Sequence, residues 1–224
     1  MLKAIIFDFN GILVDDEPIH LELFRKVLAE ERLALTDDEY YAKYLGMDDR
    51  GCFRAVFKAN GRDLDDAELA ELIRRKAAYY KDTIARRTVI FPGVRRLVPE
   101  LAARFPLAVA SGALRQEIEL ILDGIGLKKC FQSIVSAEDV HDGKPHPEIF
   151  IKALHELNKD RSEPIRASEC LVIEDSKEGI MAAHRAGIKC LAVTNSHPAA
   201  ELKADSVVAS LEEVDAAFLE ALLK

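Results

Sequence analysis

Three acidic residues follow apolar runs of the length expected for buried strands. Asp8 follows the run at 4–7, and the adjacent pair Glu174 and Asp175 follows the run at 171–173. Unbroken apolar runs are typical of parallel strands that are covered on both faces, and such sheets bind ligands beyond the carboxyl ends of their strands. Carboxylates gathered there repel one another unless a hard cation lies among them. Mg²⁺ prefers oxygen ligands and shares its remaining positions with water and phosphate, so the sequence predicts a magnesium site.

Two further polar residues are candidates for the same site, and each also has a more ordinary interpretation. Ser111 ends another apolar run, and Lys144 lies in a loop before a Pro-x-Pro sequence. Taken alone, Ser111 is typical of a helix cap and Lys144 of a solvated loop lysine. In the same way, Asp8 is typical of a turn residue, and Glu174 of a cap on the next helix. The order of all four motifs in the chain favours the functional interpretation.

The elements that must position these residues alternate between strand and helix from residue 88 onward. Such alternation predicts an α/β fold, a Rossmann-like parallel sheet with helices on both faces. Further strands are predicted at 107–110, 133–135, 170–173, 189–193 and 206–209. Helices are predicted at 94–103, 114–122, 147–157 and 177–186, with closing helices at 201–203 and 211–223.

The segment between Asp15 and Thr88 contains no strand candidate. Apolar residues recur at helical spacing after Pro18, and a long amphipathic helix runs from Leu69 to Ile84. The sequence of residues 36–39, Thr-Asp-Asp-Glu, is a capping box that starts a helix. We therefore expect two domains, a Rossmann-like core of residues 1–15 and 88–224 and an all-helical domain of residues 16–87.

Composition excludes several classes of partner. The chain has 224 residues, 49% of them hydrophobic, and 31 Lys and Arg against 39 Asp and Glu give a net charge of −8. No basic field is available to bind nucleic acid. No apolar run approaches the roughly 18 residues of a membrane span, and no secretory signal is recognisable. The absence of a secretory signal predicts a cytoplasmic location. The four cysteines show no Cys-x-x-Cys spacing, so we expect reduced thiols. We also expect a monomer.

In the order and spacing of the four motifs the chain resembles the haloacid dehalogenase-like superfamily, specifically its β-phosphoglucomutase and phosphatase-like branch. The motifs of that branch are Asp-x-Asp, Ser or Thr, Lys, and a pair of acids. The resemblance implies a Rossmann-like core with an inserted helical cap. It also implies a magnesium-dependent phosphohydrolase or phosphotransferase that acts on a small phosphorylated metabolite through an aspartyl-phosphate on Asp8.

The resemblance also assigns roles to individual residues. It makes Asp8 and Asp175 side-chain ligands of Mg²⁺ and residue 10 a ligand through its main-chain carbonyl, while Glu174 ligates directly or through water. Lys144 and the Ser111 hydroxyl then hold the oxygens of the phosphoryl group as negative charge spreads over them.

One residue departs from the pattern of the branch. The first motif is Asp8-Phe9-Asn10, with an amide where the branch usually has its second aspartate. That aspartate acts as general acid and base, a contribution of roughly 10²–10⁴-fold, and an amide cannot exchange its proton usefully. We therefore expect that Asn10 slows or abolishes catalysis, unless another group supplies the proton or the leaving group of the substrate needs none.

Substrate recognition is assigned by the resemblance to His20, Gly46, Arg50 and Lys76 in the cap, with Ser111 and Gly112 in the core. The cap residues also have ordinary interpretations. Arg50 and Lys76 lie on charge-rich helices, where a solvated face is the usual explanation, and His20 can be a satisfied helix histidine.

Other functions stay open at this point. The first alternative is a catalytically silenced protein that binds or senses a phosphorylated ligand, which Asn10 motivates. A phosphonatase-like enzyme, with Lys43 as the lysine that forms a Schiff base, is a further alternative. Haloacid dehalogenation is disfavoured because that branch works without magnesium, whereas this chain keeps the acidic pair Glu174 and Asp175.

Overall fold

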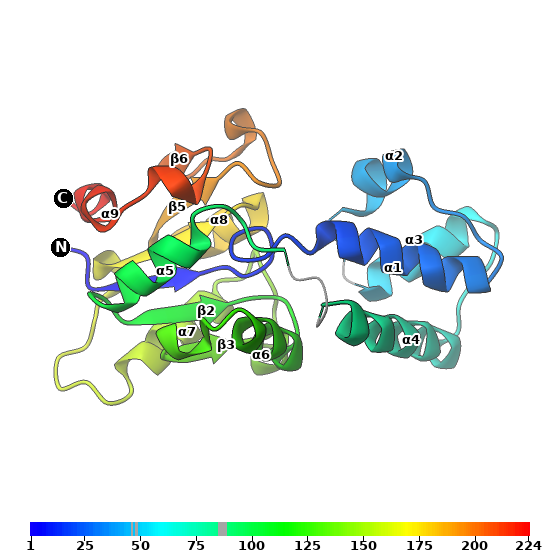
Figure 1. Ribbon diagram of the computed structural model, residues 1–224, viewed down its shortest axis with the longest axis horizontal. Coiled ribbons are helices and arrows are strands. Elements are labelled where there is room, and N and C mark those ends of the chain that lie inside the picture. Colours follow the sequence, from blue (N-terminus) through cyan, green and yellow to red (C-terminus); the bar gives the residue numbers. More distant parts are fainter. Residues whose placement is uncertain (46, 48, 85–88) are drawn as a thin grey trace. The chain divides into compact units, whose positions relative to one another are not determined.

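The chain folds into two compact units. The computed structural model describes residues 1–45, 47, 49–84 and 89–224 (Figure 1). The first unit consists of Met1–Asp15 and Thr88–Lys224, and we call it the core unit. The second consists of Asp16–Arg87, and we call it the helical insert. Each unit is described separately below.

The core unit is built on a parallel sheet with the strand order β3-β2-β1-β4-β5-β6. The sheet starts at β1 in the middle and grows in both directions, as in doubly wound folds, and it confirms the predicted Rossmann-like parallel sheet. In such sheets ligands bind where the order reverses, here between β1 and its neighbour β4. The strands are β1 (Ala4–Phe7), β2 (Leu107–Ala110), β3 (Ser133–Val135), β4 (Cys170–Glu174), β5 (Lys189–Val193) and β6 (Ser206–Val208).

The register of the three central strands brings their carboxyl ends to one edge. Phe7 pairs with Val109 of β2 and with Ile173 of β4. The ladder continues one residue further, because the amide of Asp8 donates to the carbonyl oxygen of Ile173 at 2.9 Å. The residues that follow these strands therefore emerge side by side.

Both faces of the sheet are covered. On one face, helices α7 and α8 pack on small side chains such as Ala4, Ala108 and Cys170. On the other face, larger side chains such as Phe7 and Leu107 are fully buried as well. Burial on both faces explains why these strands read as continuous apolar runs.

The helices of the core unit match the predicted ones to within two residues, except at the end of the chain. They are α5 (Val94–Ala102), α6 (Arg115–Gly124), α7 (Glu148–Asn158), α8 (Lys177–Arg185) and α9 (Ala216–Leu222). Short 3₁₀ turns connect the elements, at η2 (Lys128–Cys130), η3 (Ala137–Asp139), η4 (Ala167–Glu169), η5 (Ala199–Glu201) and η6 (Leu211–Glu213).

The two predicted closing helices were wrong in extent. Of the segment predicted at 201–203 only Glu201 is helical, as the last residue of the 3₁₀ turn η5, and the helix predicted at 211–223 is split into η6 and α9. The split occurs because Val214 is extended and Asp215 then caps a new helix, its Oδ1 accepting from the amide of Phe218 at 2.7 Å. An N-cap of this kind starts a helix rather than continuing one.

The helical insert has no strand among its described residues, as predicted. Its elements are α1 (Glu17–Glu30), α2 (Asp37–Glu39), the π-helical segment η1 (Tyr40–Tyr44), α3 (Asp49–Ala59) and α4 (Asp66–Ile84). The predicted capping box is confirmed, since Thr36 accepts from the amide of Glu39 and the Glu39 side chain accepts from the amide of Thr36. The insert has its own apolar core, which includes Phe24, Phe53 and Leu69.

Lys76 contradicts the interpretation of its helix face as solvated. Its side chain is buried in the insert, 1% exposed, and its ammonium group donates to Asp49 Oδ1 at 2.5 Å. The same group lies 2.8 Å from His20 Nδ1 and 4.2 Å from the ring centroid of Phe24. Buried lysines require such partners, because an unpaired ammonium group is costly to desolvate.

We expect Lys76→Ala to lower the free energy of unfolding by about 2–4 kcal/mol, because it removes a buried stem and leaves Asp49 without its cation. Lys81→Ala is the matched control, since Lys81 lies on the same helix but is exposed. The control should change stability by less than about 0.5 kcal/mol. Urea unfolding of both variants measures the difference, and equal stabilities would show that the contacts of Lys76 contribute nothing.

Candidate functional site

Four of the predicted site residues meet at the carboxyl edge of the sheet. Asp8 follows β1, Glu174 ends β4, and Asp175 comes next in the chain. The ammonium group of Lys144 donates to both Asp8 Oδ1 and Glu174 Oε1, each at 2.5 Å. One lysine therefore joins Asp8 and Glu174, which are more than a hundred positions apart in the sequence.

The acidic part of this cluster is buried and carries more negative than positive charge. One carboxylate oxygen each from Asp8, Glu174 and Asp175 lie within 4.8 Å of one another, and the three residues are 7%, 0% and 4% exposed. Among the described residues, Lys144 contacts two of these three acids, Asp8 and Glu174. Three buried carboxylates against one ammonium group leave an excess of negative charge.

The pKa values of the three acids reflect their burial as well as this imbalance of charge. Burial raises the pKa of Asp8 to about 7, although Lys144 opposes the shift. Burial, together with the charges of Glu174 and Asp8, raises the pKa of Asp175 to about 8. Burial also acts on Glu174, but there Lys144 and the donors of Ser176 outweigh it and lower the pKa. At Asp8 and Asp175, therefore, nearby positive charge does not offset the effect of burial on the pKa.

A hard divalent cation fits this arrangement. Oxygen ligands on one or two carboxylates, with room for water and phosphate, are what Mg²⁺ usually takes from a protein. Asp8 and Asp175 are the residues whose charge is least compensated, and a cation between them would remove the repulsion. The donor set therefore suits Mg²⁺ at this edge of the sheet.

Glu174 is engaged differently from the two aspartates. Its Oε2 accepts from the amides of Asp175 and Ser176 and from Ser176 Oγ, each at 2.9 Å, while Oε1 accepts from Lys144. Glu174 is the last residue of β4, and the N-cap of α8 is Ser176, which accepts from the amide of Gly179 at 3.0 Å. The interpretation of Glu174 as the helix cap is therefore wrong, although it does bind two amides in front of the helix.

Two glycines allow close approach to these acids. A Cβ atom on Gly11 would lie 1.9 Å from Asp175 Oδ2, and one on Gly179 would lie 1.8 Å from Glu174 Oε1. Gly11 also has a φ of +80°, which L side chains rarely adopt. Gly11 therefore lets the backbone turn after Asp8, and its missing side chain makes room for the carboxylate of Asp175.

Ser111 and Asn10 lie together beside the cluster. Ser111 Oγ donates to Asn10 Oδ1 at 3.3 Å and accepts from the amide of Ala113 at 3.1 Å. Ser111 is buried, whereas Gly112 is exposed. The N-cap residue of α6 is Leu114, so the interpretation of Ser111 as a helix cap is wrong.

The predicted substrate residues of the insert fall into three groups. His20 and Lys76 contact each other, and His20 Nε2 lies 3.1 Å from Asp16 Oδ2. Arg50 is exposed on α3. Gly46 lies outside the described residues. Their assignment to substrate binding stays a prediction.

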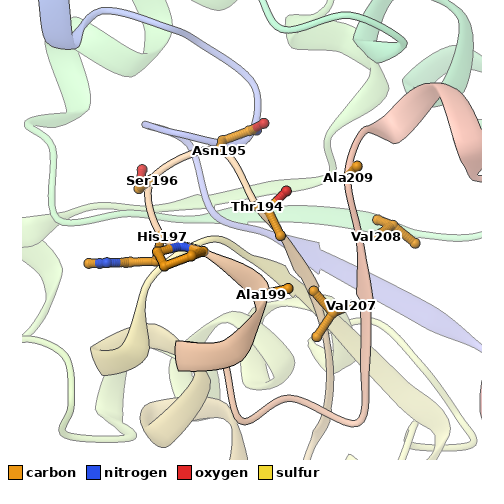
Figure 2. Close-up of a pocket in the computed structure, with 9 residues that line it drawn as sticks. Thr194, Asn195, Ser196, His197, Ala199, Val207, Val208 and Ala209 are labelled. Atoms are coloured by element: carbon orange, nitrogen blue, oxygen red, sulfur yellow. The ribbon is translucent and has the colours of Figure 1, made fainter.

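Two residues of the core unit join the site without having been predicted. Asn195 and Ser196 lie in the loop after β5, as Figure 2 shows. Ser196 Oγ donates to Asp175 Oδ2, and Asn195 Nδ2 donates to the carbonyl oxygen of Gly11 at 2.6 Å. A sequence signal existed, since both residues follow a predicted strand as Asp8 and Ser111 do.

The parallel sheet, the helical insert after β1 and the buried acidic cluster define an α/β protein suited to binding a cation at the edge of its sheet. Residues 5–193 match the family model of the haloacid dehalogenase-like hydrolases. The chain belongs to this family, as the sequence motifs predicted.

Two of the proteins that are similar to this chain are phosphatases. The chain is 30% identical to the phosphorylated carbohydrates phosphatase of Thermotoga maritima, over 84% of this chain and 83% of the relative. It is also 30% identical to the validoxylamine A 7'-phosphate phosphatase of Streptomyces hygroscopicus subsp. limoneus, over 96% of both proteins. The solved structure of CbbY from Rhodobacter sphaeroides in complex with phosphate is 24% identical and superposes with a TM-score of 0.84, covering 98% of this chain and all of CbbY.

No helix in the described part of the chain combines the length and the apolar composition that crossing a bilayer requires.

Proposed function

We propose that the protein is a Mg²⁺-dependent phosphatase or phosphotransferase that acts on a small phosphorylated metabolite through an aspartyl-phosphate. The observation that carries this proposal is the buried cluster in which Lys144 bridges Asp8 and Glu174 beside Asp175. Two relatives over most of the chain are phosphatases, one of them of phosphorylated carbohydrates. A phosphorylated sugar or a related polyol is therefore the first substrate class to test.

Asp8 is the proposed nucleophile. One of its carboxylate oxygens attacks phosphorus, the bond to the leaving oxygen breaks, and the electron pair departs with that oxygen. Water, or a second substrate hydroxyl, later attacks the aspartyl-phosphate and regenerates the carboxylate. Lys144 donates to Asp8 Oδ1, so its ammonium group can stabilise the negative charge first on the carboxylate and then on the phosphoryl oxygens.

Asp8 and Asp175 are the proposed side-chain ligands of Mg²⁺, with the main-chain carbonyl of Asn10 as a third ligand. When bound, Mg²⁺ supplies positive charge against the phosphoryl oxygens. Glu174 has a supporting role in this proposal, because both its oxygens already accept hydrogen bonds. It holds Lys144 in place, and it would reach a bound cation through water. Ser111 donates its hydroxyl to a phosphoryl oxygen.

A screen of phosphorylated sugars, polyols and nucleotides with Mg²⁺ tests the proposal, with phosphate release as the measurement. We expect turnover of at least one compound, lost when the metal is removed with EDTA and restored by added Mg²⁺. Turnover that Asp8→Ala abolishes would exclude the silenced binding protein. Binding of a phosphorylated compound without any turnover would favour it. Activity that persists in EDTA would contradict the metal assignment.

We expect Gly11→Ala to weaken Mg²⁺ binding by at least about tenfold, because its Cβ would displace Asp175. Gly126→Ala is the matched control, since Gly126 has a similar φ of +75° but no atom within 4 Å of the added Cβ. Both variants should lose about 1–2 kcal/mol of stability through backbone strain. Only Gly11→Ala should change the affinity, measured by calorimetric titration with Mg²⁺. Equal affinities in the two variants would remove Asp175 from the ligand set.

A further inference from the structure

The loop after β5 contacts the acidic cluster at two points. Ser196 donates its hydroxyl to Asp175 Oδ2, and Asn195 donates its amide to the carbonyl oxygen of Gly11. Figure 2 shows both residues at the top of this loop, with the pale blue N-terminal segment passing beside Asn195. Neighbouring residues of one loop thus bind two different parts of the site.

These two parts also contact each other. Gly11 packs so closely on Asp175 that a Cβ atom would lie 1.9 Å from its Oδ2, the oxygen that accepts from Ser196. The four residues Gly11, Asp175, Ser196 and Asn195 therefore form a closed ring of contacts. A displacement of Asn195 or Ser196 would therefore shift both the Asp175 carboxylate and the turn that follows Asp8.

We propose that Asn195 and Ser196 are positioning residues for the site, Ser196 for the Mg²⁺ ligand Asp175 and Asn195 for the turn at residues 8–11. This inference rests on the proposed function, because it assumes that Asp175 binds the cation. Ser196 restricts the rotation of the Asp175 carboxylate by holding Oδ2, so that Oδ1 would be the oxygen available to a bound cation. Hydrogen bonds to a ligating carboxylate orient it in this way, and their loss typically weakens metal binding by 10–100-fold.

Asn195 holds the turn at residues 8–11 through its hydrogen bond to Gly11. Its bond to Gly11 fixes the turn that carries the main-chain carbonyl of Asn10, the proposed third ligand, and the nucleophile Asp8 three residues before Gly11. A primary amide suits this role, since it donates to a carbonyl oxygen without adding charge to an acidic site. The loop itself is anchored to the sheet, because the amide of Thr194 donates to the carbonyl oxygen of Val208 at 3.1 Å.

The same loop offers a matched control. Thr194, Asn195 and Ser196 all line a pocket of about 550 Å³ between the loop and the end of β6 (Figure 2). Thr194 keeps its backbone bond to Val208 in the isosteric variant Thr194→Val, which alters the pocket but neither contact to the ring. Effects of Ser196→Ala that Thr194→Val does not share therefore come from the contact with Asp175.

The test is the affinity of the full chain for Mg²⁺ alone, measured by calorimetry and by the rise of the unfolding temperature with Mg²⁺. We expect Ser196→Ala and Asn195→Ala each to raise the Kd by about tenfold or more. Ser196→Thr, which keeps the hydroxyl, should restore the affinity to within a few-fold of the original protein. Because the two contacts share one ring, the double variant should lose less than the product of the single effects.

The outcomes separate this inference from the proposed function. If the original protein binds no Mg²⁺, the proposed metal dependence fails and the inference fails with it. If the original protein binds Mg²⁺ and Ser196→Ala binds equally well, the inference alone is overturned. A Ser196→Ala protein with weaker Mg²⁺ binding but an unchanged unfolding temperature in EDTA supports positioning. A lower unfolding temperature in EDTA with unchanged Kd would make Ser196 merely structural.

Discussion

Replacing Asp8 with asparagine should reduce phosphate release by on the order of 10⁴–10⁶-fold, as loss of a covalent nucleophile does in other enzymes. The amide has nearly the shape of the carboxylate but cannot attack phosphorus, so no aspartyl-phosphate can form. The fold should persist, because Lys144 keeps its bond to Glu174 at 2.5 Å. Without Mg²⁺ the unfolding temperature should not fall, since the amide replaces a buried carboxyl group whose ionised form is disfavoured by burial and by the charge of Glu174.

Steady-state phosphate release and intact-mass detection of phosphorylated protein measure the effect of Asp8→Asn. Asp160→Asn is a suitable control, because Asp160 is an exposed aspartate of the same unit, far from Asp8 in the sequence. The control should retain full activity. If Asp8→Asn kept more than about a hundredth of the turnover, the covalent mechanism would be contradicted, and direct attack of water on the substrate would be the better explanation.

The sheet could be predicted from the sequence because its strands are buried on both faces. Burial on both faces produces unbroken apolar runs, and a polar residue marks the end of a run at Asp8 and Ser111. In parallel strands these ends meet at one edge, so the convergence of Asp8, Glu174 and Asp175 followed from topology alone. Lys144 required the resemblance to the family, since nothing in a loop sequence shows where a lysine side chain ends.

The roles of Lys76, Asn195 and Ser196 could not be predicted, because they depend on contacts that leave no pattern in the neighbouring sequence. Lys76 lies among charged residues of α4, and its burial is decided by Asp49 and His20 on other helices of the insert. Asn195 and Ser196 resemble an ordinary polar loop, and their roles depend on where Gly11 and Asp175 lie in space. Pairing between distant side chains is a property of the folded packing, which hydrophobic periodicity does not describe.

Restoring Asn10→Asp should raise turnover of alkyl phosphates by roughly 10²–10⁴-fold, the usual contribution of a general acid and base. In the proposed mechanism an alkyl phosphate leaves as a strongly basic alkoxide and needs a proton, which the amide of Asn10 cannot usefully give. The structure accommodates the change, because an aspartate at this position can accept the hydrogen bond that Ser111 Oγ now gives to Asn10 Oδ1 at 3.3 Å. Mg²⁺ affinity should change little, since the proposed ligand from residue 10 is its main-chain carbonyl.

The size of the gain should depend on the leaving group. An aryl or acyl phosphate leaves as a weak base, so its cleavage should gain less from Asn10→Asp than cleavage of an alkyl phosphate. Hydrolysis of the aspartyl-phosphate also needs a base, so phosphorylated Asp8 should accumulate in the original protein and disappear in the restored variant. Steady-state rates on both substrate types and intact-mass spectra measure these effects, with Asn10→Ala as the control that removes the amide without adding an acid. Equal rates of the original protein and Asn10→Asp on alkyl phosphates would mean that another residue supplies the proton.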